Sequence, residues 1–83
     1  MYGKTIEIKV KEGLHARPAA EFVKAATKFR DTNIRLSVGG SAANAKSIMS
    51  VLSLGAGAGS MIYICADGIQ EKEAVETLCA LVE

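Results

Sequence analysis

His15, the only histidine of the chain, stands two residues before Arg17 and three before Pro18. Proline is tolerated in the first turn of a helix because the amides there have no intrahelical acceptor, so Pro18 marks the start of a helix. At that end, the unpaired amides and the positive end of the helix dipole favour an anion. A neutral imidazole can act as a nucleophile, and a guanidinium can hold phosphoryl oxygens. The spacing therefore indicates a phosphohistidine site, with His15 as the acceptor and Arg17 as the phosphate contact.

A purely structural interpretation of the same residues has about equal weight: His15 caps the helix and Arg17 is a solvated charge. In the phosphohistidine interpretation, the helix dipole and Arg17 both disfavour the imidazolium, which leaves a ring nitrogen free to attack near neutral pH. Both also favour the dianion once the phosphate is attached. The spacing of these residues alone does not decide between the two interpretations.

Ser47 precedes a second predicted helix, where its hydroxyl is expected to act as an N-cap worth about 1 kcal/mol. Next to it, Ile48, Met49 and Leu52 could form an apolar docking patch beside both sites. Apolar residues at this spacing are more often core, by roughly two to one.

Composition excludes several classes of function. The chain has 83 residues and a net charge of +1, with 10 Lys+Arg against 9 Asp+Glu, so we expect one domain spanning residues 1–83. The basic residues are spread along the chain, which argues against nucleic acid as a partner. Cys65 and Cys79 form no CxxC pair and only one histidine is present, so a tetrahedral metal site cannot be assembled. We expect both cysteines to be reduced and buried.

Residues 47–66 could be taken for a membrane span, and the glycine-rich run within them for a nucleotide-binding loop, but neither interpretation fits the sequence. Residues 47–66 hold no charged residue and are long enough to span a membrane, but the Gly-Ala-Gly-Ala-Gly run at 55–59 would break a helix in its middle. That run does not predict a nucleotide loop either, since it follows a helix and precedes a strand. We interpret it as a turn. Charged residues interrupt the N-terminal segment, so we expect no signal peptide, no membrane insertion and a cytoplasmic protein.

Hydrophobic periodicity predicts the elements that must position these residues. Strict alternation of apolar and polar residues predicts the first two strands, and a Gly-Gly hairpin signal at 39–40 predicts a returning strand from the weak segment after it. The segment 61–66 is apolar on both faces, which predicts a central strand. Apolar residues at helical spacing predict helices. The order is β-α-β-β-α-β-α, which indicates an α+β, two-layer, open-faced sandwich with a four-stranded antiparallel sheet covered on one face by three helices. The expected strands are residues 5–11, 34–38, 41–45 and 61–66, and the expected helices are residues 16–29, 47–54 and 70–82.

Two segments carry a family resemblance. Residues 13–20, Gly-Leu-His-Ala-Arg-Pro-Ala-Ala, resemble the active-site signature of the HPr family of histidine-containing phosphocarriers from the bacterial sugar phosphotransferase system. Residues 44–55, Asn-Ala-Lys-Ser-Ile-Met-Ser-Val-Leu-Ser-Leu-Gly, are similar to the second signature of that family. The resemblance covers essentially the whole chain, and two motifs in the right order make it specific.

The resemblance implies that His15 accepts a phosphoryl group from phosphorylated Enzyme I and passes it to IIA components of sugar permeases. Phosphoenolpyruvate is then the ultimate donor. The ring nitrogen nearer the backbone would carry the phosphate, Arg17 would contact it, and the amides of Ala16 and Arg17 would complete its cradle. No cofactor is implied, and the chain would act as a covalent carrier in a relay, not as a stand-alone catalyst. We expect a monomer.

The resemblance also implies a regulatory role for Ser47. In many Gram-positive bacteria an ATP-dependent HPr kinase/phosphorylase phosphorylates the equivalent serine, and a catabolite-control transcription factor is then a further partner. For Ile48 and Met49, the resemblance favours an exposed docking role over a place in the core. A phosphate at a helix N-terminus is tolerated by the dipole, so it would act on partners and not on the fold.

Other functions stay open from the sequence. One is a paralogous carrier for nitrogen regulation or dihydroxyacetone phosphorylation, and another is a regulatory HPr-like module acting through Ser47 alone. Such modules usually lack the active-site histidine, whereas His15 is present here. A third is a binding scaffold without phosphotransfer. The interval from His15 to Ser47 is one residue longer than usual in the family, and the extra residue falls within 30–33.

Overall fold

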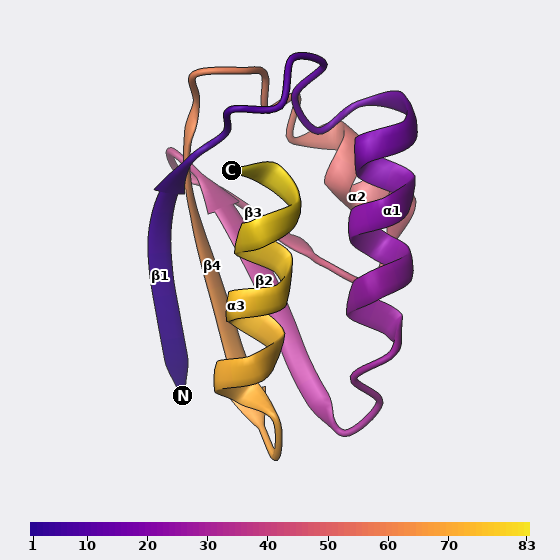
Figure 1. The fold of residues 1–83 in the computed structure, drawn as a ribbon, viewed down its shortest axis with the longest axis vertical. Coiled ribbons are helices and arrows are strands. Elements are labelled where there is room, and N and C mark those ends of the chain that lie inside the picture. Colours follow the sequence, from indigo (N-terminus) through magenta and orange to yellow (C-terminus); the bar gives the residue numbers. More distant parts are fainter.

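The computed structural model describes residues 1–83, and its seven elements follow the predicted order (Figure 1). Each strand and each helix was expected near the place where it occurs. The strands are β1 (Tyr2–Glu7), β2 (Thr32–Val38), β3 (Ser41–Asn44) and β4 (Met61–Gly68), and the helices are α1 (Ala16–Thr27), α2 (Ile48–Ser53) and α3 (Glu71–Val82).

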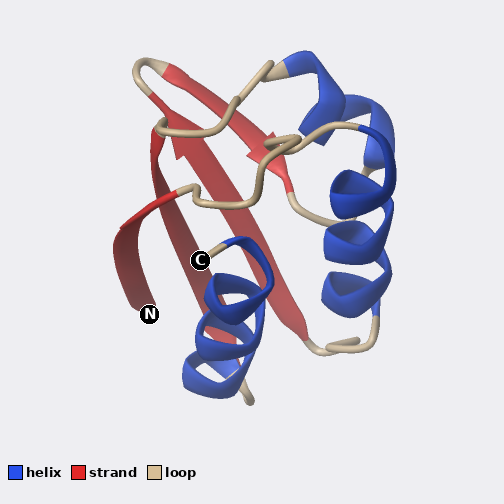
Figure 2. Ribbon diagram, turned by 45° about the horizontal axis from the view of Figure 1, so that its top comes forward, coloured by secondary structure: helices blue, strands red, loops and turns tan.

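The four strands form one antiparallel sheet in the order β1-β4-β2-β3. The central strand β4 pairs with β1 on one side and with β2 on the other; for example, Ile64 lies between Lys4 and Leu36. The three helices cover one face of this sheet, and the other face is open to solvent (Figure 2). The predicted fold class, an open-faced α+β sandwich, is therefore confirmed.

The core lies between the helices and the covered face of the sheet. Alternate strand residues such as Ile6 and Leu36 point toward the helices, where Phe22 of α1, Val51 of α2 and Leu78 of α3 meet them. Full burial of a side chain the size of Phe22 contributes about 2–3 kcal/mol. This one apolar layer fixes where the helix ends stand above the sheet.

A polar contact on the covered face joins the edge strand β1 to α3. The Tyr2 hydroxyl donates to Glu76 Oε2 at 2.7 Å, and Lys4 Nζ lies 3.6 Å from Glu76 Oε1. These two neighbours, the Tyr2 hydroxyl first, hold the pKa of Glu76 below its usual range. All three residues retain contact with solvent, so this contact supplements the apolar layer and does not replace it.

Some element boundaries differ from the predicted ones. The first strand was expected over residues 5–11 but runs over Tyr2–Glu7, because the amides of Lys9 and Val10 turn to the Val82 carbonyl at the end of α3. The first helix ends at Thr27, two residues earlier than expected, since Lys28 and Phe29 close it with shorter-range bonds to Ala25 and Ala26.

The central position predicted for β4 is confirmed, whereas the expectation that both cysteines are buried is wrong for Cys65. Apolar residues occupy both faces of β4, but Met61 and Tyr63 lie on the open face and are 56% and 43% exposed. Cys79 is buried in α3 as expected, whereas Cys65 points to the open face and is only partly buried. An apolar strand sequence indicates a central position, and it does not show that both faces are covered.

No helix of the chain has the length and apolar character needed to cross a membrane. The uncharged segment 47–66 divides into α2, the glycine-rich turn and the start of β4. The turn interpretation of residues 55–59 is thereby confirmed.

Candidate functional site

His15 is the N-cap residue of α1, with an extended backbone conformation (φ −133°, ψ 162°). Its side chain is exposed and makes no capping hydrogen bond. The geometry therefore gives no support to the interpretation in which His15 merely caps the helix. Both ring nitrogens are left available for chemistry with a partner.

The first turn of α1 presents an environment suited to an anion. It contains no acidic residue, and Pro18 at the third helical position has no amide proton to satisfy. The amides of Ala16 and Arg17 are among those without an intrahelical acceptor. A negative group placed at this end is stabilised by about 0.3–1 kcal/mol through the helix dipole.

Ala16 has a left-handed backbone conformation with φ 52°, the only positive φ outside glycine in the chain. Holding a non-glycine residue in this region costs about 1 kcal/mol or more, and such residues cluster where structure serves function. No sequence pattern indicates this feature, because alanine is ordinarily a residue of regular helix.

Arg17 is exposed and free of acidic partners. The three ion pairs of the molecule involve other residues, although Glu12 and Glu21 lie on the rim of the same hollow. Its guanidinium can therefore turn toward phosphoryl oxygens without first breaking an internal contact. The hollow beside His15 is shallow and is lined by Glu12, Ala16, Arg17, Pro18 and Glu21.

The loop that carries His15 is held by the glycine-rich turn. Leu14 is fully buried, and its amide donates to the Ala56 carbonyl at 2.8 Å. Gly13 has φ +69°, and a Cβ there would lie 2.6 Å from Gly57 Cα and 2.7 Å from Ala56 O. Only glycine fits this close approach. Gly13 and Ala56 are positioning residues that sequence analysis did not identify, although a glycine directly before the His15 motif was a visible signal.

Ser47 is the N-cap of α2, as predicted. Its backbone is extended (φ −114°, ψ 113°), and its hydroxyl accepts a hydrogen bond from the Ser50 amide at 3.4 Å. The length of this bond indicates a weak cap. The serine is half-buried, so its oxygen is still within reach of solvent.

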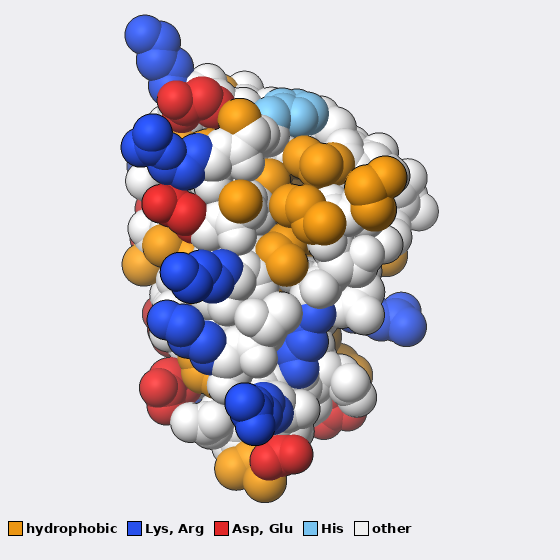
Figure 3. All heavy atoms as spheres, turned by 90° about the vertical axis from the view of Figure 1, so that its right-hand side faces the viewer, with side chains coloured by type: hydrophobic (Ala, Val, Ile, Leu, Met, Phe, Trp, Pro, Cys, Tyr) orange, Lys and Arg blue, Asp and Glu red, His pale blue; other side chains and the backbone are white.

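Ile48, Met49 and Leu52, named here the docking patch, lie on the surface of α2. Their exposed fractions are 38%, 71% and 36%, while Val51 alone of this helix is buried. The resemblance-based expectation that Ile48 and Met49 are not core is consistent with this exposure, and the general pattern that favoured core is wrong here. Figure 3 shows the pale-blue side chain of the single histidine beside a group of hydrophobic side chains on the face formed by α1 and α2.

Helices α1 and α2 pack against each other, and Figure 3 shows the histidine beside hydrophobic side chains on the surface that they share. Ser47 begins α2 directly before the docking patch. No three side chains of His, Cys, Asp or Glu lie together in a way that could ligate a metal ion. This surface therefore combines an exposed imidazole that makes no capping hydrogen bond, an unpaired guanidinium, helix amides without an intrahelical acceptor and apolar side chains.

Comparison with known proteins agrees with this arrangement. The family model described as PTS HPr component phosphorylation site matches residues 2–83. The phosphocarrier protein HPr of Vibrio cholerae is 47% identical over 83 residues, which cover all of this chain and 96% of that protein. The HPr-like protein Crh of Halalkalibacterium halodurans is 46% identical over 83 residues and is covered to 98%. The crystal structure of the phosphocarrier protein HPr from Bacillus anthracis superimposes with a TM-score of 0.96 at 44% identity, covering 99% of this chain and 96% of that chain.

The fold and the site define a small, open-faced α+β protein built around an exposed histidine at a helix start. The chain belongs to the HPr family of phosphocarriers of the phosphotransferase system. Its relatives include both HPr and the HPr-like protein Crh at similar identity.

Proposed function

We propose that this chain carries a phosphoryl group on His15, which it accepts from phosphorylated Enzyme I and passes to IIA components of sugar permeases. The observation that supports this most strongly is the environment of His15. Its side chain is exposed, makes no capping hydrogen bond and precedes a first helical turn that contains no acidic residue. On acceptance, the ring nitrogen of His15 nearer the backbone forms a bond to phosphorus while the bond between phosphorus and Enzyme I breaks. The dianionic phosphoryl group is then held by Arg17 and by the amides of Ala16 and Arg17. On onward transfer, that nitrogen–phosphorus bond breaks while the IIA component forms a bond to phosphorus.

An open site suits a carrier better than a deep pocket. A carrier must neither hydrolyse its phosphate quickly nor bind it so tightly that onward transfer slows. The hollow beside His15 is shallow, so a docked partner can complete the site with its own groups for each half of the reaction. The proposed chemistry needs no metal or cofactor from this chain.

Docking of Enzyme I and IIA components would use the patch next to His15. Exposed apolar side chains on a small protein mark interaction surfaces, and methionine adapts to more than one partner. Arg17 and Lys24 of α1 and Lys28, the residue that caps its C-terminus, are exposed and follow one another at spacings of seven and four residues, which places them on one face. Partners with acidic rims around an apolar centre would fit this combination.

Regulation through Ser47 is the second part of the proposal. Its half-buried hydroxyl lies directly before the docking patch, so a phosphate there would place a negative charge at the edge of that patch. We expect phosphorylation by an HPr kinase/phosphorylase to weaken docking of Enzyme I and to promote docking of a catabolite-control transcription factor. Transfer rates that are unchanged in Ser47→Asp would count against this.

The relatives leave two candidates, an HPr and a Crh-like paralogue. The presence of His15 favours the carrier, since regulatory modules that act through the serine alone usually lack that histidine. A carrier for nitrogen regulation or dihydroxyacetone phosphorylation would use the same site with a different Enzyme I. Each of these reactions would take place in the cytoplasm, which is where we expect the chain to act, as a monomer.

The distinguishing experiment reconstitutes the relay. The chain is incubated with phosphoenolpyruvate and either a sugar-branch or a nitrogen-branch Enzyme I, and onward transfer to a IIA protein is followed with radiolabelled phosphate. We expect label to reach IIA through the wild-type chain with the sugar-branch Enzyme I and to be absent with His15→Ala. In a parallel reaction the chain is incubated with an HPr kinase and labelled ATP. A chain that is labelled there but by neither Enzyme I would instead support the Crh-like function.

A further inference from the structure

The open face of the sheet contains a second hollow, on the side opposite to the helices that carry the His15 site. It has a volume of about 610 Å³, is half open to solvent and lies over β2, β3 and β4. This volume is in the range that small-molecule sites occupy, about 300–1,000 Å³. The polar side chains that line it are Asn33, Arg35, Asn44, Lys46 and Asp67.

Arg35 stands in the middle of the hollow without a partner. In the register of the sheet it lies between Asn44 on β3 and Cys65 on β4, and directly paired residues of antiparallel strands share a face about 4.5–5.5 Å apart. None of the three ion pairs in the molecule includes Arg35, and its guanidinium donates no hydrogen bond within the chain. All five of its N–H groups are therefore available to a ligand.

Asn44 on β3 adds a donor to this guanidinium. Its Oδ1 accepts a hydrogen bond from the Lys46 amide at 2.9 Å, which leaves the Nδ2 group of Asn44 as a free donor. Lys46 also lines the hollow, but its Nζ donates to the carbonyl of Phe29, a core residue shortly after α1, at 2.6 Å and is therefore engaged outside the hollow.

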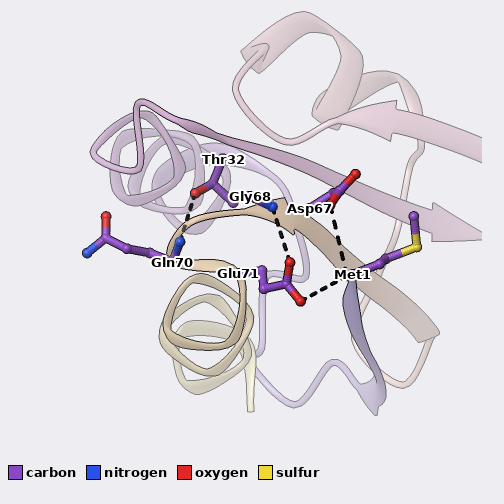
Figure 4. A network of polar contacts seen from close by, with 6 residues as sticks. All are labelled: Met1, Thr32, Asp67, Gly68, Gln70 and Glu71. Carbon is purple, nitrogen blue, oxygen red and sulfur yellow. Dashed lines mark hydrogen bonds and ion pairs between the residues drawn. The ribbon is translucent and has the colours of Figure 1, made fainter.

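Asp67 is the only residue with a carboxylate that lines the hollow, and it lies near the amino group of Met1 and forms no ion pair with Arg35. Its Oδ1 lies 3.9 Å from the amino group of Met1, which also lies 2.9 Å from Glu71 Oε2 (Figure 4). Glu71 in turn accepts a hydrogen bond from the Gly68 amide at 3.2 Å. The acidic groups near the hollow are thus engaged with Met1 and the turn after β4, and they do not neutralise Arg35 or Lys46.

We propose that this hollow binds a small organic oxyanion, a carboxylate or phosphate carried by a molecule of metabolite size. A planar oxyanion accepts two parallel hydrogen bonds from the Arg35 fork, and Asn44 Nδ2, on the directly paired residue, is a further donor for its oxygens. The hollow lies on the other side of the sheet from His15, so this site is separate from the proposed phosphoryl site. It does not depend on the proposed function.

The test is a titration of the ¹⁵N-labelled chain followed by amide chemical shifts, with inorganic phosphate and citrate as probes. Sodium chloride keeps the ionic strength constant, because screening alone shifts exposed signals. We expect saturable changes at Asn33, Arg35 and the side-chain amide of Asn44, with dissociation constants in the millimolar range. Response to citrate alone assigns a carboxylate ligand, to phosphate alone a phosphate ester, and to both a general oxyanion site.

The critical variant is Asn44→Asp. Its carboxylate keeps the acceptor for the Lys46 amide but gives Arg35 an internal anion, so we expect binding to weaken by about tenfold. Lys24→Gln removes one positive charge from the helix layer and should leave the affinity within about twofold. The proposal is overturned if the wild-type chain shows no saturable change at these residues, if shifts are confined to the first turn of α1, or if Asn44→Asp binds as well as the wild type.

Discussion

Replacing Gly13 by alanine tests whether the glycine-rich turn positions the His15 loop. The residue has φ +69°, and its added Cβ would lie 2.6 Å from Gly57 Cα and 2.7 Å from Ala56 O. Both neighbours are backbone atoms, which cannot rotate away as the end of a flexible side chain could. The turn would have to retreat by about 0.8 Å to restore an ordinary contact of 3.4 Å.

The expected cost has two parts. A non-glycine residue in the left-handed region loses about 1–2 kcal/mol. Displacement of the turn weakens the bond from the Leu14 amide to the Ala56 carbonyl, which contributes about 1 kcal/mol. We therefore expect Gly13→Ala to lower the free energy of unfolding by about 2–3 kcal/mol, a large share of the stability of so small a domain.

Urea unfolding followed by circular dichroism measures this change, and Gly39→Ala is the matched control. Gly39 has φ +60° and nothing within 4 Å of its added Cβ, so it reports the backbone cost alone, about 1–2 kcal/mol. Transfer from Enzyme I should also slow in Gly13→Ala and stay unchanged in Gly39→Ala, because only the first displaces His15. Equal destabilisation by the two substitutions would refute the positioning role.

Three further predictions concern the helix start, pH and docking. Ala16→Gly should change the free energy of unfolding by less than about 0.5 kcal/mol, because relief of the positive φ offsets the flexibility of glycine. Ala20→Gly, at an exposed position inside α1, should instead lower the free energy of urea unfolding by about 1 kcal/mol. The lowered pKa of Glu76 means that its contacts with β1 stabilise the fold above the ordinary pKa of 4.5 and that this contribution is lost as the pH falls through the lower folded value. Glu76→Gln should therefore flatten the loss of stability measured by urea unfolding below that pH, and an unchanged pH dependence would contradict the assignment. Met49→Asp should slow transfer from Enzyme I by about tenfold in a rapid-quench assay. Met61→Asp, on the open face, should have no effect on this rate. Equal rates for the two variants would show that the docking patch does not bind Enzyme I.

Periodicity was sufficient to predict most of the fold, because most elements have a clear pattern and polar or glycine-rich breaks separate them. The short strand β3 has no such pattern and was predictable only from the Gly-Gly hairpin signal before it. The pattern could not predict where the first strand ends, since that depends on the Val82 carbonyl at the far end of the chain. The central position of β4 was predictable because the strand is apolar on both faces, although Met61 and Tyr63 face solvent where nothing covers the sheet.

The site was predictable to a similar extent. Pro18 located the helix start and with it the position of His15, as local rules of helix termini require. The contact between Gly13 and the turn joins segments more than 40 residues apart, and no local pattern reports such a contact. The left-handed conformation of Ala16 has no signal in the sequence either. Exposure of the docking patch likewise depends on which face of α2 meets the core, and Val51 decides that.

The central claim is that His15 carries a phosphoryl group. Its most direct test is the intact mass of the chain after incubation with Enzyme I and phosphoenolpyruvate, measured again after mild acid and repeated with His15→Ala. We expect one added phosphoryl group that mild acid removes, because a bond from phosphorus to nitrogen is labile in acid whereas phosphoserine is stable, and we expect no addition to the variant. An unchanged mass with a competent Enzyme I, or an acid-stable addition that persists in His15→Ala, would contradict the claim.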